Sequence, residues 1–156
     1  MRRICLILAL ICLFSACQGS ENGMSGEMAA RRVCAACGDS ELRRADDDFV
    51  TAAIGVSDHV KWSAVYLGAT DDGTEIGLLE ATDAADVPYV KKAVWEYLES
   101  ERRSAEVLAT LYPGDGPRAK IAMIDGAIVA ERGTLVYYIL ANDTRREKIR
   151  QALVNG

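Results

Sequence analysis

Residues 60-VKWSAVYL-67, 71-DDG-73 and 74-TEIGLLEA-81 carry the strongest structural signal in this chain. In the first segment, alternate residues from Val60 to Tyr66 share one face of a strand, and all four are apolar or aromatic. The Asp-Gly pair is a turn signal between two segments of high β-propensity. We therefore expect a β-hairpin, whose two strands are antiparallel neighbours in a sheet.

A long helix is predicted after this hairpin. Asp83 or Asp86 can cap it, and the second choice places Pro88 in the first turn, where the missing N–H costs nothing. The pattern ends at Tyr112, where prolines and glycines follow. The apolar stripe consists of Val87, Val90, Val94, Leu98, Ala105, Leu108 and Leu111. Charged residues occupy the opposite side, so we expect the stripe to pack on the sheet.

A second hairpin is predicted from residues 127–132 and 134–141, which meet near Gly133. Residues 118–125, before it, show no clear pattern. A last helix begins after Asn142 and Asp143, and it carries a basic cluster that favours simple solvation, with a patch for an acidic partner as the minority interpretation. That cluster consists of Arg145, Arg146, Lys148 and Arg150.

An earlier helix is expected over residues 41–54, capped by Asp39 and Ser40 and stopped by Gly55. The element order is then helix, hairpin, long helix, hairpin, helix. It predicts a single α+β domain over residues 39–156, with two layers and a four-stranded, largely antiparallel sheet of two hairpins. A long central helix and flanking helices cover one face. The other face is left to solvent, a dimer contact or a ligand.

The N-terminus has the layout of an export signal over residues 1–16. Two arginines precede the apolar run 4–14, and Ser15 and Ala16 precede Cys17. This ending resembles the lipobox of bacterial lipoproteins, in which the cysteine is acylated and becomes the new N-terminus. Plain secretion is the main alternative, because the run is too short to span a bilayer. Residues 17–38 are expected to be the lipidated N-terminus and a flexible tether.

The predicted location is therefore the extracytoplasmic face of the cell membrane, with the membrane contacted through the lipid on Cys17. The full chain has 18 basic and 23 acidic residues and a net charge of −5. Removal of the signal takes away Arg2 and Arg3 and no acid, which leaves a charge of −7. Such a chain is repelled by nucleic acid, so we expect a protein or a small ligand as partner.

The five cysteines separate by position. Cys5 and Cys12 leave with the signal and Cys17 would carry lipid, so Cys34 and Cys37 remain as a CxxC pair. In an oxidising compartment they could form an inert local disulfide or remain an idle thiol pair, or they could be a redox-active pair if they lie at a helix N-terminus. Zinc would need two further ligands, and the single histidine, His59, has no partner nearby in sequence. We expect no metal and no cofactor.

Several short motifs follow one another along the chain. They are VYL at 65–67, TEI at 74–76, DAAD at 83–86, VKKA at 90–93, YP at 112–113 and GxxV at 133–136. In this order they resemble the bacterial domain-of-unknown-function family 4358 over roughly residues 42–153. Its members are typically small exported lipoproteins, so the resemblance implies the same location. The family has no established activity, so the resemblance implies no catalytic residues.

Three functions are compatible with these patterns. The favoured one is a membrane-anchored, non-catalytic binding domain. It would use an exposed sheet face or groove lined by the aromatics Trp62, Tyr66, Tyr137 or Tyr138. The alternatives are a thiol-disulfide participant using Cys34 and Cys37, and an enzyme built from scattered acids and hydroxyls. An enzyme would show a cleft that holds a carboxylate with a strongly raised pKa.

Overall fold

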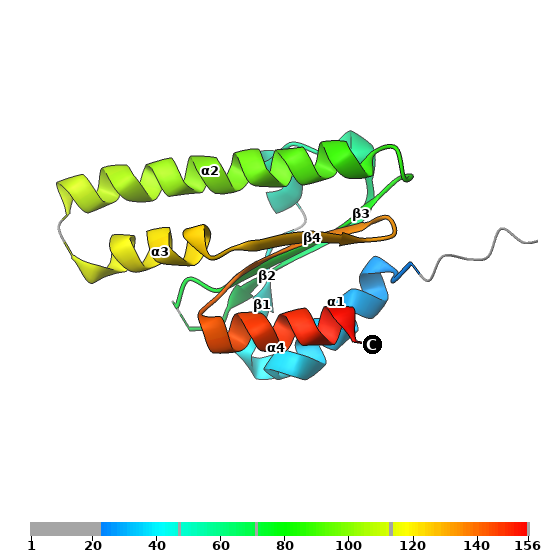
Figure 1. The fold of residues 1–156 in the computed structure, drawn as a ribbon, viewed down its shortest axis with the longest axis horizontal. Coiled ribbons are helices and arrows are strands. Elements are labelled where there is room, and N and C mark those ends of the chain that lie inside the picture. The colour runs from blue at the N-terminus through cyan, green and yellow to red at the C-terminus, as the bar shows by residue number, and fades with distance from the viewer. Residues whose placement is uncertain (1–22, 47, 71, 113, 156) are drawn as a thin grey trace, which may run out of the picture.

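The fold is a five-stranded antiparallel sheet with helices on both faces, taken here from a computed structural model (Figure 1). The structure describes residues 23–46, 48–70, 72–112 and 114–155. The strand order is β1-β2-β3-β5-β4. The strands are β1 (Leu42–Arg44), β2 (Val60–Gly68), β3 (Glu75–Ala81), β4 (Ile128–Arg132) and β5 (Leu135–Leu140). The predicted α+β class is confirmed, with one strand more than expected.

Both predicted hairpins are confirmed. Strand β2 pairs antiparallel with β3, and β4 pairs antiparallel with β5. The two hairpins join because β3 also pairs with β5, which sets Gly77 opposite Tyr138. Strand β5 has a neighbour on each side and is buried along its whole length, as its apolar sequence predicts.

The long helix α2 (Val87–Leu111) packs on one face of the sheet, and its predicted stripe is buried from Val87 to Ala105. Beyond the sheet it is accompanied by α3 (Asp115–Asp125), which runs back along its outer half (Figure 1). No structure was predicted for residues 118–125, because Gly116 and Pro117 are typical of turns and yet lie in the first turn of α3. Pro117 lies in the first turn of the helix, where its missing N–H has no partner to lose.

The opposite face is covered by α1 (Gly26–Cys37) and α4 (Asp143–Val154), so the domain has three layers instead of two (Figure 1). The predicted tether is wrong for the residues of α1. Ser25 caps this helix by accepting a hydrogen bond from the Met28 backbone N–H, and Ala29 and Val33 are fully buried. The part of the predicted tether before Gly23 lies outside the described residues.

Small residues explain why α1 escaped sequence analysis. Its buried side is built from glycine, alanine, valine and cysteine, without the large aliphatic side chains that mark the buried stripe of a helix in a sequence. Gly26 lies so close to Trp62 that a Cβ there would come within 2.0 Å of the indole ring. The Gly26 N–H donates to Glu80 Oε2 at 2.8 Å. The small residues that let α1 approach the sheet closely are therefore the same residues that make this helix hard to predict from the sequence.

The predicted helix over residues 41–54 is also wrong. A 3₁₀ turn, η1 (Asp39–Glu41), leads into β1, whose residues pair with the end of β2. Only a single π-helical turn, η2 (Val50–Ile54), follows, and it ends at Gly55 with φ of 74°. A second 3₁₀ turn, η3 (Ser57–His59), leads into β2. Pairing along the open edge of β2 overrides the local helical pattern.

Candidate functional site

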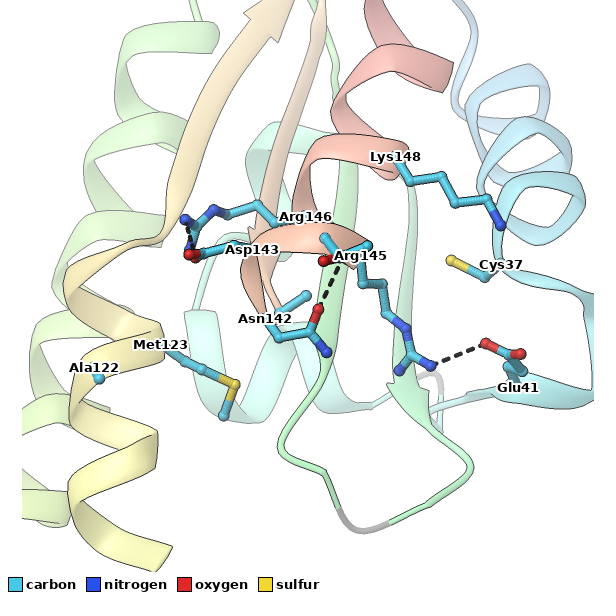
Figure 2. A pocket seen from close by; sticks show the side chains of 11 residues that line it. Cys37, Glu41, Ala122, Met123, Asn142, Asp143, Arg145, Arg146 and Lys148 are labelled. Carbon is cyan, nitrogen blue, oxygen red and sulfur yellow. Dashed lines mark hydrogen bonds and ion pairs between the residues drawn. The ribbon is translucent and has the colours of Figure 1, made fainter. Parts of the chain in front are cut away.

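A large cavity lies where the N-terminus of α4 meets the end of α1, η1 and α3. Its volume is about 760 Å³. Figure 2 shows that its charged side chains come mainly from the first turns of α4, with Cys37 and Glu41 on the opposite side. Its lining consists of Cys37, Glu41, Ala122, Met123, Ala141, Asn142, Asp143, Thr144, Arg145, Arg146 and Lys148. We call it the α4 cavity.

Arg145 links the start of α4 to η1 and to the β2–β3 turn beside the α4 cavity. Its guanidinium donates to Glu41 Oε2 at 2.9 Å, to Asp72 Oδ2 at 2.6 Å and to Thr74 Oγ1 at 3.0 Å. Burial acts to raise the pKa of Asp72, but hydrogen bonds from Thr74 and the nearby Arg145 hold this pKa below its usual value. Arg145 therefore belongs to an ion-paired network in which two carboxylates share one guanidinium, contrary to the solvated cluster expected from the sequence.

Lys148 is the unneutralised charge of the α4 cavity. Arg146 is paired with Asp143 at 2.6 Å, whereas Lys148 forms no ion pair with any residue in the described ranges. Asn142 caps α4 through Oδ1, which accepts the Arg145 backbone N–H at 3.0 Å. The partial positive charge of the helix N-terminus adds to that of Lys148. The cavity can therefore receive an anionic group.

Cys34 and Cys37 lie in the last turns of α1, and no disulfide joins these two described residues. The predicted local disulfide stays a prediction. Cys37 is buried, and burial raises the pKa of its thiol more than Arg145 and Lys148 lower it. A helix N-terminus would stabilise a thiolate through its partial positive charge. Cys34 and Cys37 lie at the C-terminal end of α1, where the partial charge of the helix dipole is negative, so this stabilisation is absent.

His59 has a partner that its sequence neighbours do not reveal. Its Nδ1 lies 2.8 Å from Asp86 Oδ1, and its ring lies against Tyr89, with centroids 4.1 Å apart and ring planes tilted by 41°. The backbone just before α2 is held by Asp83 and not by Asp86. The Ala85 N–H donates to Asp83 Oδ1 at 2.7 Å. His59 therefore fixes the chain before β2 to the start of α2.

The expected aromatic platform is covered in large part. Tyr137 and Tyr138 are buried, and Trp62 and Tyr66 are half-buried against the cluster formed with α1 and α4. Tyr137 and Tyr138 therefore cannot line an open sheet face, whereas Trp62 and Tyr66 are still partly exposed. The helix α1, which the sequence did not reveal, covers that face.

A second cavity, of about 270 Å³, opens between the sheet and α3 around Glu75. The Oε1 atom of Glu75 accepts hydrogen bonds from Tyr97 at 2.8 Å and from Tyr138 at 2.6 Å. Burial raises the pKa of Glu75 more than these two hydrogen bonds lower it. We call this the Glu75 cavity, and sequence analysis missed it because its members are far apart in the chain.

Lys120 and Met123 of α3 also line the Glu75 cavity, and Met123 lines the α4 cavity as well. Lys120 pairs with Glu101 of α2. In the described part of the chain, no three His, Cys, Asp or Glu side chains converge as a metal site would require. Cys17, the predicted lipid attachment site, lies outside the described residues.

Comparisons of the chain with protein-family models, curated proteins and solved structures give no match. The resemblance to the domain-of-unknown-function family 4358 therefore stays a prediction. None of the helices in the described ranges is both long and apolar enough to cross a membrane. Function has to be inferred from the residues themselves.

Proposed function

We propose that this protein is a lipoprotein anchored through Cys17 on the extracytoplasmic side of a membrane, whose domain binds a small anionic ligand without catalysis. The observation that carries the binding part is the α4 cavity with Lys148 unpaired among the described residues. The signal-like start of the sequence carries the anchoring part.

The chemistry of the α4 cavity favours binding over catalysis. Arg145 and Arg146 already have carboxylate partners, so neither is available to stabilise a charge that develops during a reaction. Lys148 and the N-terminal turn of α4 offer a fixed positive charge and N–H donors to an incoming carboxylate or phosphate. Cys37, the one thiol in the lining, has a raised pKa and is a poor nucleophile at neutral pH.

The anchor would hold one end of the domain near the membrane. Gly23, the first described residue, lies against the β4–β5 turn, where a Cβ on Gly133 would come within 2.9 Å of Gly23 Cα. Six residue steps from Cys17 to Gly23 span at most roughly 20 Å. The β4–β5 turn would therefore face the membrane, with the α2–α3 end at the far side of the domain (Figure 1).

Intact mass of the protein purified from its native membrane tests the anchor. We expect a chain that begins at Cys17 and carries acyl chains. A Cys17→Ser variant should lose the acyl mass and leave the membrane fraction, whereas a Cys34→Ser control should keep both. An unlipidated wild-type mass would contradict the anchor.

Calorimetric titration of the full chain with phosphate and with succinate tests the binding site. We expect saturable binding of at least one of these anions, weakened roughly tenfold by Lys148→Ala, the effect of losing one charge-assisted contact. Lys92→Ala is the matched control, because Lys92 is an exposed lysine that pairs with Glu96 on α2. Equal affinity in the two variants would contradict the assignment of the α4 cavity.

A further inference from the structure

Strand pairing places a row of four side chains across one face of the sheet, beneath the Glu75 cavity. Arg43 of β1 pairs with Leu67 of β2, Leu67 pairs with Glu75 of β3, and Glu75 pairs with Leu140 of β5. All four line this cavity. Directly paired residues project from the same side of a sheet, so a cation, an apolar residue and a carboxylate stand in sequence on one surface.

One oxygen of the Glu75 carboxylate accepts hydrogen bonds, and the other has no hydrogen-bond donor among the described residues. Both tyrosine hydroxyls donate to Oε1, and no described residue donates to Oε2. In the described part of the chain, every fully buried side-chain oxygen has a hydrogen-bond partner, so the unpartnered Oε2 is not fully buried. A purely structural role explains the bonds to Oε1 but leaves Oε2, on a residue that lines the cavity, without a donor among the described residues.

Gly77 is part of this arrangement. A Cβ at Gly77 would lie 1.9 Å from the Tyr138 ring, so only glycine lets the ring cross β3 toward Glu75. Tyr97 reaches the same oxygen from α2. Two strands and a helix thus fix the direction of the carboxylate, which is the preorganisation that a binding group requires.

Arg43 supplies the opposite charge at the other end of the row. Its side chain is exposed and forms no ion pair with a described residue. Lys120, the other cation of the lining, is held by Glu101. Arg43 is therefore the cation available to a ligand, while Leu67 forms an apolar floor between it and Glu75.

We propose that the Glu75 cavity binds a small zwitterion. Its ammonium group would donate to Glu75 Oε2, its carboxylate would accept from Arg43, and an apolar linker would lie over Leu67. Neighbouring strands are about 4.8 Å apart, so the backbones at Arg43 and Glu75 are separated by roughly 10 Å. This separation favours an ω-amino acid, and a cavity of about 270 Å³ admits a ligand of that size.

The proposal is independent of the anion site at the α4 cavity, because it uses none of the charged side chains there. Calorimetric titration of the full chain with 6-aminohexanoate tests it. We expect saturable binding that persists in Lys148→Ala, in which the α4 cavity has lost its unpaired cation. Hexanoate, which lacks the ammonium, and hexylamine, which lacks the carboxylate, should each bind roughly tenfold more weakly or worse, since each loses one charge-assisted contact.

Two variants locate the site. Glu75→Gln keeps an oxygen for the two tyrosines but removes the charge, and Arg43→Ala changes an exposed residue without touching the core. Each should weaken 6-aminohexanoate at least tenfold, whereas Lys148→Ala and Arg103→Ala should leave its affinity unchanged. If Glu75→Gln fails to fold, Arg43→Ala still decides the matter. Absence of saturable binding, or equal binding by wild type and Arg43→Ala, would overturn the proposal.

Discussion

Replacement of Val33 by alanine measures whether α1 belongs to the folded domain. Val33 is fully buried between α1 and the sheet, whereas Met28 on the same helix is 49% exposed. If α1 packs as the structure has it, Val33→Ala destabilises the protein and Met28→Ala does not. A flexible tether would make both substitutions silent.

The expected size follows from three contributions. Two buried methyl groups contribute about 1.6 kcal/mol, at about 0.8 kcal/mol each. The unfilled space adds about 1 kcal/mol, since the sheet relaxes only in part. The better helix propensity of alanine returns about 0.5 kcal/mol. The free energy of unfolding should therefore fall by about 2 kcal/mol for Val33→Ala and by less than about 0.5 kcal/mol for Met28→Ala.

Urea unfolding of the full chain in detergent, followed by tryptophan fluorescence, gives this number. Trp62 is a suitable reporter because its ring lies against Gly26 at the start of α1. In a thermal scan the same change should lower Tm by roughly 6–10 °C. Equal stability of the two variants would refute the docking of α1 and restore the tether predicted for residues 26–37.

Three further outcomes are expected. Gly77→Ala should lower the free energy of unfolding by about 2–3 kcal/mol, because the new Cβ meets the Tyr138 ring, and an unchanged urea midpoint would contradict this packing. The pKa of Glu75 is raised by burial, so the folded state holds an extra proton between about pH 4.3 and that raised pKa. Stability should therefore fall as pH rises through this window, and Glu75→Gln should abolish that fall in urea titrations at several pH values. Hydrogen bonds from Arg150 and, to a lesser degree, Gln151 lower the pKa of Glu147 to about 2. Carbon NMR titration should show this pKa return toward about 4.3 in Arg150→Ala, and an unmoved midpoint would exclude the pair.

Elements with strong local signals could be predicted from the sequence. Segments of high β-propensity next to turn signals predicted the strands of both hairpins, and the positions of Asp86 and Pro88 predicted the start of α2 to within a residue. Asn142 was correctly placed as the cap of α4. Each of these signals depends on residues within a few positions of one another, so no knowledge of the remaining chain is needed.

The candidate sites could not be predicted in the same way. Arg145 could be seen as a basic residue, but its pairing with Glu41 crosses 104 positions of sequence. The bond from Tyr138 to Glu75 crosses 63 positions. His59 could be seen, but its contact with Asp86, 27 residues away, could not. A signal did exist for Glu75, since a charged residue on the buried face of a strand needs a partner.

The sequence alone is sufficient for the class of the domain, because hairpins and an amphipathic helix are encoded by the period at which apolar residues recur. Tertiary structure was needed for the third layer, the fifth strand and both cavities. The short β1 forms because β2 offers an open edge, and α1 docks because small residues allow close approach to the sheet. The Glu75 cavity exists because strand register brings Arg43, Leu67 and Glu75 side by side. Register is a property of strands paired over long distances, and no local window of the chain contains it.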